Sequence, residues 1–328
     1  MLLFWGVVAT ALLFDFTNGF HDTANAVATS VSTRALGPRT AVGIAAAMNF
    51  AGAFTSTAVA TTIGTAILSA DAKITEEVLL AALAGAIGWN LLTWYLALPS
   101  SSSYALIGGL IGGAIAADDT SAVHWAGVGR SVLVPALVAP LLGFVGAFAL
   151  LIAVLWGARH ARASVVNRQF RLAQIGAGSL MAFAHGANDA QKTMGVIGIA
   201  LVSSGRAAEF EVPLWVIVAS ASALAAGTYV GGWRIMRTIG YRVFRIEPPH
   251  GFAAQAAATG VLLGTAAAGL PVSTTHVITG SVFGAGTAGR VGHVAWSLAL
   301  EILTVWILTL PAAALFAAAA YLPLRIFG

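Results

Sequence analysis

Apolar segments, each close to the length that crosses a lipid bilayer, follow one another along almost the whole chain. Only 9% of its 328 residues are charged and 59% are hydrophobic, whereas about 25% of residues in a soluble domain are charged. A spanning helix needs ~20 mostly apolar residues, and the runs here approach that length. The sequence therefore predicts an all-α, multi-pass integral membrane protein.

Other compositional features exclude several function classes. The chain has no cysteine, so disulfides and thiolate metal sites are ruled out. Residues 1–14 lack a basic start and a cleavage site, and we interpret them as part of the first helix rather than as a signal peptide. The pI is 9.9, but basic residues cluster only in short loops, which argues against a nucleic-acid partner.

Two motifs occur twice, in the same order. "NGFHDTANA" at 18–26 aligns with "HGANDAQKT" at 185–193, and "LPSSSSYALIGG" at 98–109 aligns with "LPVSTTHVITGS" at 270–281. The number of residues from each motif to its second copy is nearly the same for the two motifs, which indicates an internal duplication. We expect a first repeat at 1–158, a short basic cytoplasmic loop at 159–171, and a second repeat at 172–328.

Equivalent loops of the two repeats carry opposite charge. The loop after the first motif is basic, with Arg34 and Arg39, but its counterpart carries Glu209 and Glu211. Because Lys and Arg collect on the cytoplasmic side, equivalent loops are expected on opposite sides of the membrane. This predicts an inverted-topology repeat, the plan of many secondary transporters, in the cell (inner) membrane with both termini outside.

The segments 100–117 and 272–288 are short for a spanning helix, and each is preceded by proline. We therefore expect broken helices and two re-entrant helical hairpins. Asp22 and Asp189 lie about halfway along two other predicted helices. A carboxylate at mid-bilayer costs roughly 2.5–3.5 kcal/mol on insertion scales and marks a functional site by default. Such an acid can hold a small cation or carry a proton.

Polar side chains surround these acids and open the two short helices. Hydroxyls and free N–H groups at a helix start form an anion site, although ordinary N-capping is the alternative. Lys192 could contact an anion or form an ion pair with Asp189. The candidate anion-binding residues are Asn25, Ser101, Ser102, Ser103, Gln191, Lys192, Ser273, Thr274 and Thr275.

Three further residues remain open. His185 and Asp189 share a helix face and could bind a metal, but no third ligand is evident, so a packed histidine is favoured over a metal enzyme. His276 aligns with Tyr104 and could form an aromatic polar lid or act as a ligand. Glu301 lies in the last apolar segment and could face a partner helix or subunit.

The four motifs resemble the signature repeats of the inorganic phosphate transporter (PiT) family, and the resemblance covers essentially the whole chain. "NDAQK" is similar to the bacterial low-affinity branch. The sodium-coupled members tend to have an Asn-Ala pair in both repeats, and here only Asn25 and Ala26 form one. The resemblance places the phosphate and cation site on Asp22, Asn25, Asp189, Gln191 and Lys192, together with the paired hydroxyl segments.

The resemblance implies a homodimeric carrier, not an enzyme, that imports phosphate by cation symport. Asp22 and Asp189 would serve the coupling cation, with protons expected and sodium as the alternative. A divalent metal such as Mg²⁺ could enter with phosphate as a neutral complex, in which case these two acids would contact it. No resident cofactor is expected. The alternatives are a sulfate permease on the same scaffold and, from another class, an anion channel.

Overall fold

The computed structural model describes residues 1–69, 71–72 and 74–327, and within them the fold is helical. Within these ranges, one isolated antiparallel β-bridge joins Leu68 to Val123. The first half contains α1 Leu2–Ser32, α2 Pro38–Gly52, α3 Ala58–Ala66, α4 Glu76–Tyr95, α5 Ser102–Ala117, α6 Trp125–Val128 and α7 Val134–Gly157. The second contains α8 Ala163–Ser203, α9 Leu214–Val230, α10 Trp233–Arg237, α11 Pro248–Ala267, α12 Thr274–Arg290 and α13 Trp296–Phe327.

Four helical segments of the described chain are long and apolar enough to cross a membrane. They are α1, α4, the continuous segment Trp125–Gly157, and α13. A further candidate span, Leu214–Val230 with Trp233–Arg242, is bent by 56°. These segments confirm the predicted all-α membrane fold.

The basic loop expected at 159–171 is shorter in the structure. α7 ends at Gly157 and α8 begins at Ala163, so the second part of the expected loop is helical. Arg168 and Arg171 therefore lie on the first turns of α8. Arginine is a good helix former, and polar residues can extend a helix beyond the apolar run that defines its hydrophobic part.

The main helix contacts cross between the first and second halves of the chain. α1 packs on α9, and α8 packs on α2. Likewise α5 packs on α13, and α12 packs on α7. Each half thus supplies the partner for the short helix of the other, so the two halves interlock.

Glycines bring the short helices into backbone contact with these partners. A Cβ on Gly112 of α5 would lie 2.1 Å from the carbonyl oxygen of Ala314 in α13. A Cβ on Gly284 of α12 would lie 2.1 Å from the carbonyl oxygen of Phe144 in α7. Small residues of this kind let helix backbones approach closely in membranes.

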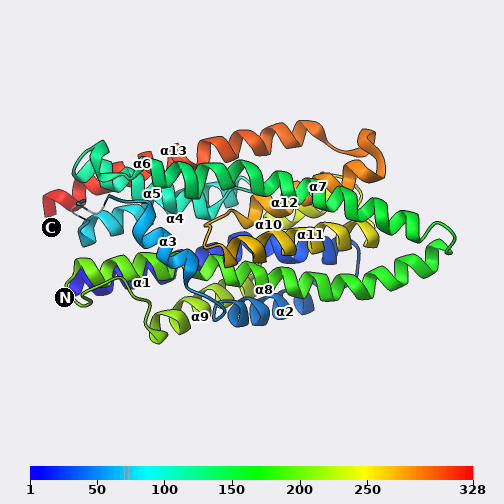
Figure 1. Cartoon of the computed structure of the whole chain (residues 1–328), viewed down its shortest axis with the longest axis horizontal. Helices are drawn as coiled ribbons and strands as arrows, with labels where there is room; N and C mark the ends of the chain where they lie inside the picture. The colour runs from blue at the N-terminus through cyan, green and yellow to red at the C-terminus, as the bar shows by residue number, and fades with distance from the viewer. Residues whose placement is uncertain (70, 73, 328) are drawn as a thin grey trace.

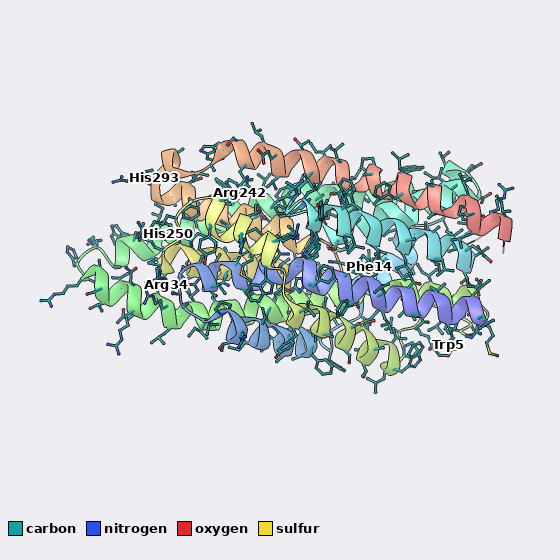
Figure 2. All side chains as sticks on the ribbon, turned by 180° about the vertical axis from the view of Figure 1, so that it is seen from behind. Trp5, Phe14, Arg34, Arg242, His250 and His293 are labelled. Carbon is teal, nitrogen blue, oxygen red and sulfur yellow. The ribbon has the colours of Figure 1, made fainter. Side chains whose placement is uncertain are left out.

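The bundle has two distinct ends. Both chain termini lie at one end, and the connection between α7 and α8 lies at the other (Figure 1). Figure 2 shows Trp5 at the end with the termini, and Arg34, Arg242 and His293 at the opposite end. α1 and α8 run in opposite directions side by side through the middle (Figure 1).

Replacing Gly112 by Ala should destabilise the protein, because the added methyl group cannot be accommodated without separating α5 from α13. Overpacking of this kind costs typically about 1–3 kcal/mol. Thermal unfolding of the purified protein would measure the loss. Gly264→Ala in α11 is the matched control, since a Cβ there meets nothing within 4 Å. Equal melting temperatures for the two variants would contradict the packing argument.

Candidate functional site

The antiparallel packing of α1 on α8 brings Asp22 and Asp189 into one buried cluster. Asp22 is 2% exposed and Asp189 is fully buried. Their motif glycines allow neighbouring helices to approach, since a Cβ on Gly186 would lie 2.0 Å from the carbonyl oxygen of Asn49. The expected meeting of the two repeat motifs is therefore present in the structure.

Asp189 is surrounded by donors. The Lys192 ammonium donates to its Oδ1. Asn18 Nδ2 donates to its Oδ2 at 3.1 Å, and His185 Nε2 lies 3.3 Å from the same oxygen. Of the two sequence-based alternatives for Lys192, the ion pair with Asp189 is the one observed.

Asp22 is held by a different set. Its Oδ1 lies 2.5 Å from His21 Nδ1. At its Oδ2, Thr275 Oγ1 donates at 3.3 Å and Thr274 Oγ1 at 3.5 Å, the latter at the limit of a hydrogen bond. The start of α12 is thus linked to α1 through this carboxylate.

Each of the two acids is approached by a side chain from the other half of the chain. Asn18 and His185 occupy equivalent positions, each four residues before the Asp of its own helix. Asn18 reaches Asp189 of the other half, and His185 Nε2 lies 3.9 Å from Asp22 Oδ2. Any relative movement of α1 and α8 must therefore change the environment of both acids.

Asp22, His185 and Asp189 could together hold a cation. Each offers one ligand atom, and these atoms lie within 4.8 Å of one another. The sequence had shown no third ligand for His185 and Asp189, and the structure supplies Asp22 from the other half of the chain. Two carboxylates with one imidazole suit a hard or borderline cation. His185 Nδ1 lies 3.1 Å from Asn49 Oδ1, which fixes the ring.

The serine hydroxyls at the starts of α5 and α12 have different roles. Ser101 and Ser273 cap α5 and α12, because each Oγ accepts a hydrogen bond at 3.2 Å from the backbone N–H three residues later. Ser103 Oγ donates to the Val272 carbonyl at 3.3 Å, so the starts of the two short helices meet. The buried Ser102 hydroxyl has no hydrogen-bond partner among the described residues. It is therefore available to a ligand.

The two amide candidates differ. Asn25 Nδ2 donates to Thr275 Oγ1 at 2.9 Å, and its buried Oδ1 makes no hydrogen bond within the described ranges. Gln191 is engaged at both ends of its amide. Its Oε1 accepts from Val59 N at 2.8 Å at the start of α3, and its Nε2 donates to the Ala187 carbonyl at 2.5 Å. Its bonds in this structure position α3, whereas ligand binding was expected from the sequence.

His276 and Glu301 have roles that the sequence left open. His276 stacks on Trp306 at 3.8 Å between ring centroids and meets the Tyr104 ring edge-on at 5.1 Å. It therefore packs as an aromatic group beside the start of α12. The Glu301 side chain is exposed on α13.

His21 was not among the site residues expected from the sequence. It is 1% exposed, and its Nε2 lies 3.3 Å from both Thr93 Oγ1 and Ser100 Oγ. It thus links Asp22 to the turn that precedes α5. Its signal was present, since it stands next to Asp22 inside an apolar helix. Asn49 was missed because it lies in an Ala-rich run without a repeated motif.

A separate cavity of about 670 Å³ opens at the end of the bundle that carries Arg34 and Arg242 (Figure 2). Arg171 and Arg245 also line it. Neither Asp22 nor Asp189 belongs to its lining. The central cluster is thus closed, while the basic end is open.

Known proteins match this chain over nearly its full length. A model described as "Phosphate transporter family" matches residues 18–317. A "Probable low-affinity inorganic phosphate transporter" of Mycobacterium leprae (strain TN) is 50% identical over 327 residues, which cover 98% of this chain and 78% of that protein. Proteins with the same description from Rhizobium meliloti (strain 1021) and Bacillus subtilis (strain 168) are 45% and 44% identical, and each match covers 96% of this chain and 95% of the relative.

A solved structure shares the fold. It is titled "The sodium-dependent phosphate transporter", and it superposes with a TM-score of 0.89 over 100% of both chains. Sequence identity is 23%. The likeness establishes the helical architecture and nothing about the coupling ion of this chain.

Lys192→Met should destabilise the protein, because it leaves the buried Asp189 without its ammonium partner. Breaking a buried ion pair in this way costs about 3–5 kcal/mol. The double variant Lys192→Met/Asp189→Asn removes both charges and should recover most of that loss. Thermal unfolding of the three proteins measures the effect. A double variant as unstable as the single one would show that the ion pair does not hold this region together.

Proposed function

Because the chain belongs to the phosphate transporter family, we propose that it is a secondary active transporter that imports inorganic phosphate by symport with protons. The relatives are named as transporters rather than as enzymes. The apolar helices make the chain a multi-pass membrane protein. The site, the coupling ion and the transport cycle are the parts of the proposal that go beyond family membership.

One observation carries the proposed site. The start of α12 reaches Asp22 through the Thr274 and Thr275 hydroxyls, and the start of α5 meets the start of α12 through the Ser103–Val272 hydrogen bond. Helix starts favour anions through their N–H groups and dipoles. The Ser102 hydroxyl and the Lys192 ammonium are both buried, and the Ser102 hydroxyl makes no hydrogen bond within the described residues. Phosphate would bind there, with Asn25, Thr274 and Thr275 completing the lining.

The acids supply the coupling. Asp22 and Asp189 repel a bare anion, so phosphate enters favourably only with positive charge. A proton or a cation meets this need, since neutralisation lowers the cost of moving charge through a low-dielectric barrier. The arrangement of Asp22, His185 and Asp189 also supports entry of phosphate as a neutral complex with a divalent metal. The metal would then be cargo rather than a resident cofactor.

Transport would proceed by alternating access between the two halves. The opposite directions of α1 and α8 and the exchanged helix pairings support an inverted repeat. In this scheme the short helices α5 and α12 belong to the two re-entrant hairpins, and residues 1–158 and 172–328 are the two repeats. The cavity lined by Arg34 and Arg242 would be the cytoplasmic mouth, with both termini outside the cell membrane. A homodimer is the expected assembly.

Asp22→Asn should abolish accumulation of phosphate driven by a pH gradient, because the variant loses a central charge of the coupling site. The measurement is uptake of radiolabelled phosphate into proteoliposomes under a pH gradient or a sodium gradient, each with and without Mg²⁺. Ser222→Ala is a matched control, since that hydroxyl is exposed on α9 and bonds within its own helix. We expect the control to accumulate phosphate like the unmodified chain.

The same assay separates the rival functions. Uptake driven by sodium alone would keep the phosphate carrier and overturn proton coupling. Sulfate that is carried in preference to phosphate would indicate a sulfate permease. Flux that follows voltage and needs no coupling ion would indicate an anion channel. Normal pH-driven accumulation by Asp22→Asn would contradict the coupling role of this acid.

A further inference from the structure

A third acid, Asp15, lies inside the protein and has no part in the site described above. It is fully buried on α1. Neither of its carboxylate oxygens has a hydrogen-bond partner among the described residues. It stands seven residues before Asp22, which places both on the same face of α1, two turns or about 10 Å apart. Figure 2 labels the neighbouring Phe14 inside the bundle, well away from Trp5 at the end.

Asp15 differs from the two site acids in its surroundings. Asp189 is paired with an ammonium and accepts from Asn18, and Asp22 has His21 and the α12 hydroxyls. Asp15 has no such fixed donor. Burying an ionised carboxylate without a hydrogen bond is unfavourable, so this environment suits the neutral acid.

The groups that interact electrostatically with Asp15 all lie on α8. They are Asp189, Lys192 and His185, with the Thr193 hydroxyl beside it. Thr193 Oγ1 is itself buried and makes no hydrogen bond within the described part of the chain. The titratable side chains on the other helical segments that contact α1 are Arg39 of α2, Glu76, Glu77 and Tyr95 of α4, Tyr104 of α5, Tyr229 of α9, Arg234 and Arg237 of α10, Tyr241 and Arg242 of the helical turn Thr238–Arg242, His250 of α11, and His276 and Arg290 of α12.

We propose that Asp15 is a third acid of the coupling machinery, which binds a proton away from the phosphate site and is linked to that site through Lys192. This inference rests on the proposed proton symport. Lys192 carries three N–H donors, of which one is directed at Asp189. When Asp15 holds a proton, the Lys192 ammonium can donate hydrogen bonds both to Asp189 and to an incoming phosphate. When Asp15 loses its proton, the new carboxylate competes for the same ammonium.

Proton and phosphate binding therefore favour each other. By linkage, a proton on Asp15 tightens phosphate binding, and bound phosphate tightens the proton by the same factor. Asp15 lies on the side of Asp22 toward the end with the termini, which is the outer end in the proposed orientation. The proton would bind to an Asp15 oxygen from outside before the site closes, and the same O–H bond would break on the cytoplasmic side after phosphate leaves.

The test uses the full chain in proteoliposomes, with Asp15→Asn, Asp15→Ala and Asp15→Glu. Two readouts are compared: exchange of labelled for unlabelled phosphate at equal pH, and accumulation under an imposed pH gradient. The two neutral variants should keep exchange within a few-fold of the unmodified chain and lose gradient-driven accumulation by about tenfold or more. Asp15→Glu should restore accumulation, since it retains a titratable acid.

Several outcomes would overturn the inference. Full pH-driven accumulation by Asp15→Asn would exclude Asp15 as the coupling group while leaving the proposed function intact. Loss of exchange together with accumulation would assign Asp15 to phosphate binding instead. If neither neutral variant folds while Asp15→Glu does, the acid is structural. If the unmodified chain shows no pH-driven accumulation, proton symport itself fails and this inference fails with it.

Discussion

The fold depends on the pairing of charged side chains that are buried inside an apolar helix bundle. Lys192, Asp189 and Asp22 are all at most 2% exposed, and buried charges of this kind are stable only when paired and hydrogen-bonded. Lys192 and Asp189 pair within α8, whereas Asn18 contacts Asp189 and His185 approaches Asp22 only because α1 and α8 lie side by side. The polar residues that make these helices unfavourable in lipid are therefore the same ones that bind the two halves of the chain together.

Interlocking of the halves makes this central contact precise. The short helices α5 and α12 each pack by glycine against the last helix of the other half. The start of α12 is thereby held where its Thr274 and Thr275 hydroxyls reach Asp22. The side chains of Asn18 and His185 likewise reach across, Asn18 to Asp189 and His185 to Asp22. In the proposed cycle, this mutual dependence is what couples occupancy of the site to relative movement of the halves.

Much of this arrangement could be predicted from the sequence because it is repeated. Asp22 and Asp189 stand in matching motifs, and the structure brings them together as expected. The separate roles of the other candidates could not be predicted. Gln191 bonds to the start of α3, and Ser101 and Ser273 cap helices, because a motif gives residue type but not the direction of a side chain. Asp15 aligns with Ala182 in the second half, so a search for repeated motifs passes over it, although an acid in an apolar helix is itself a signal.

The central claim is that one anion binds between the starts of α5 and α12, next to the two acids. A crystal structure of the full chain grown with arsenate, a heavier analogue of phosphate with a strong anomalous signal, would test it most directly. We expect an anomalous peak beside Ser102 and Lys192. A peak only in the cavity lined by Arg34 and Arg242, with none at the centre, would contradict it.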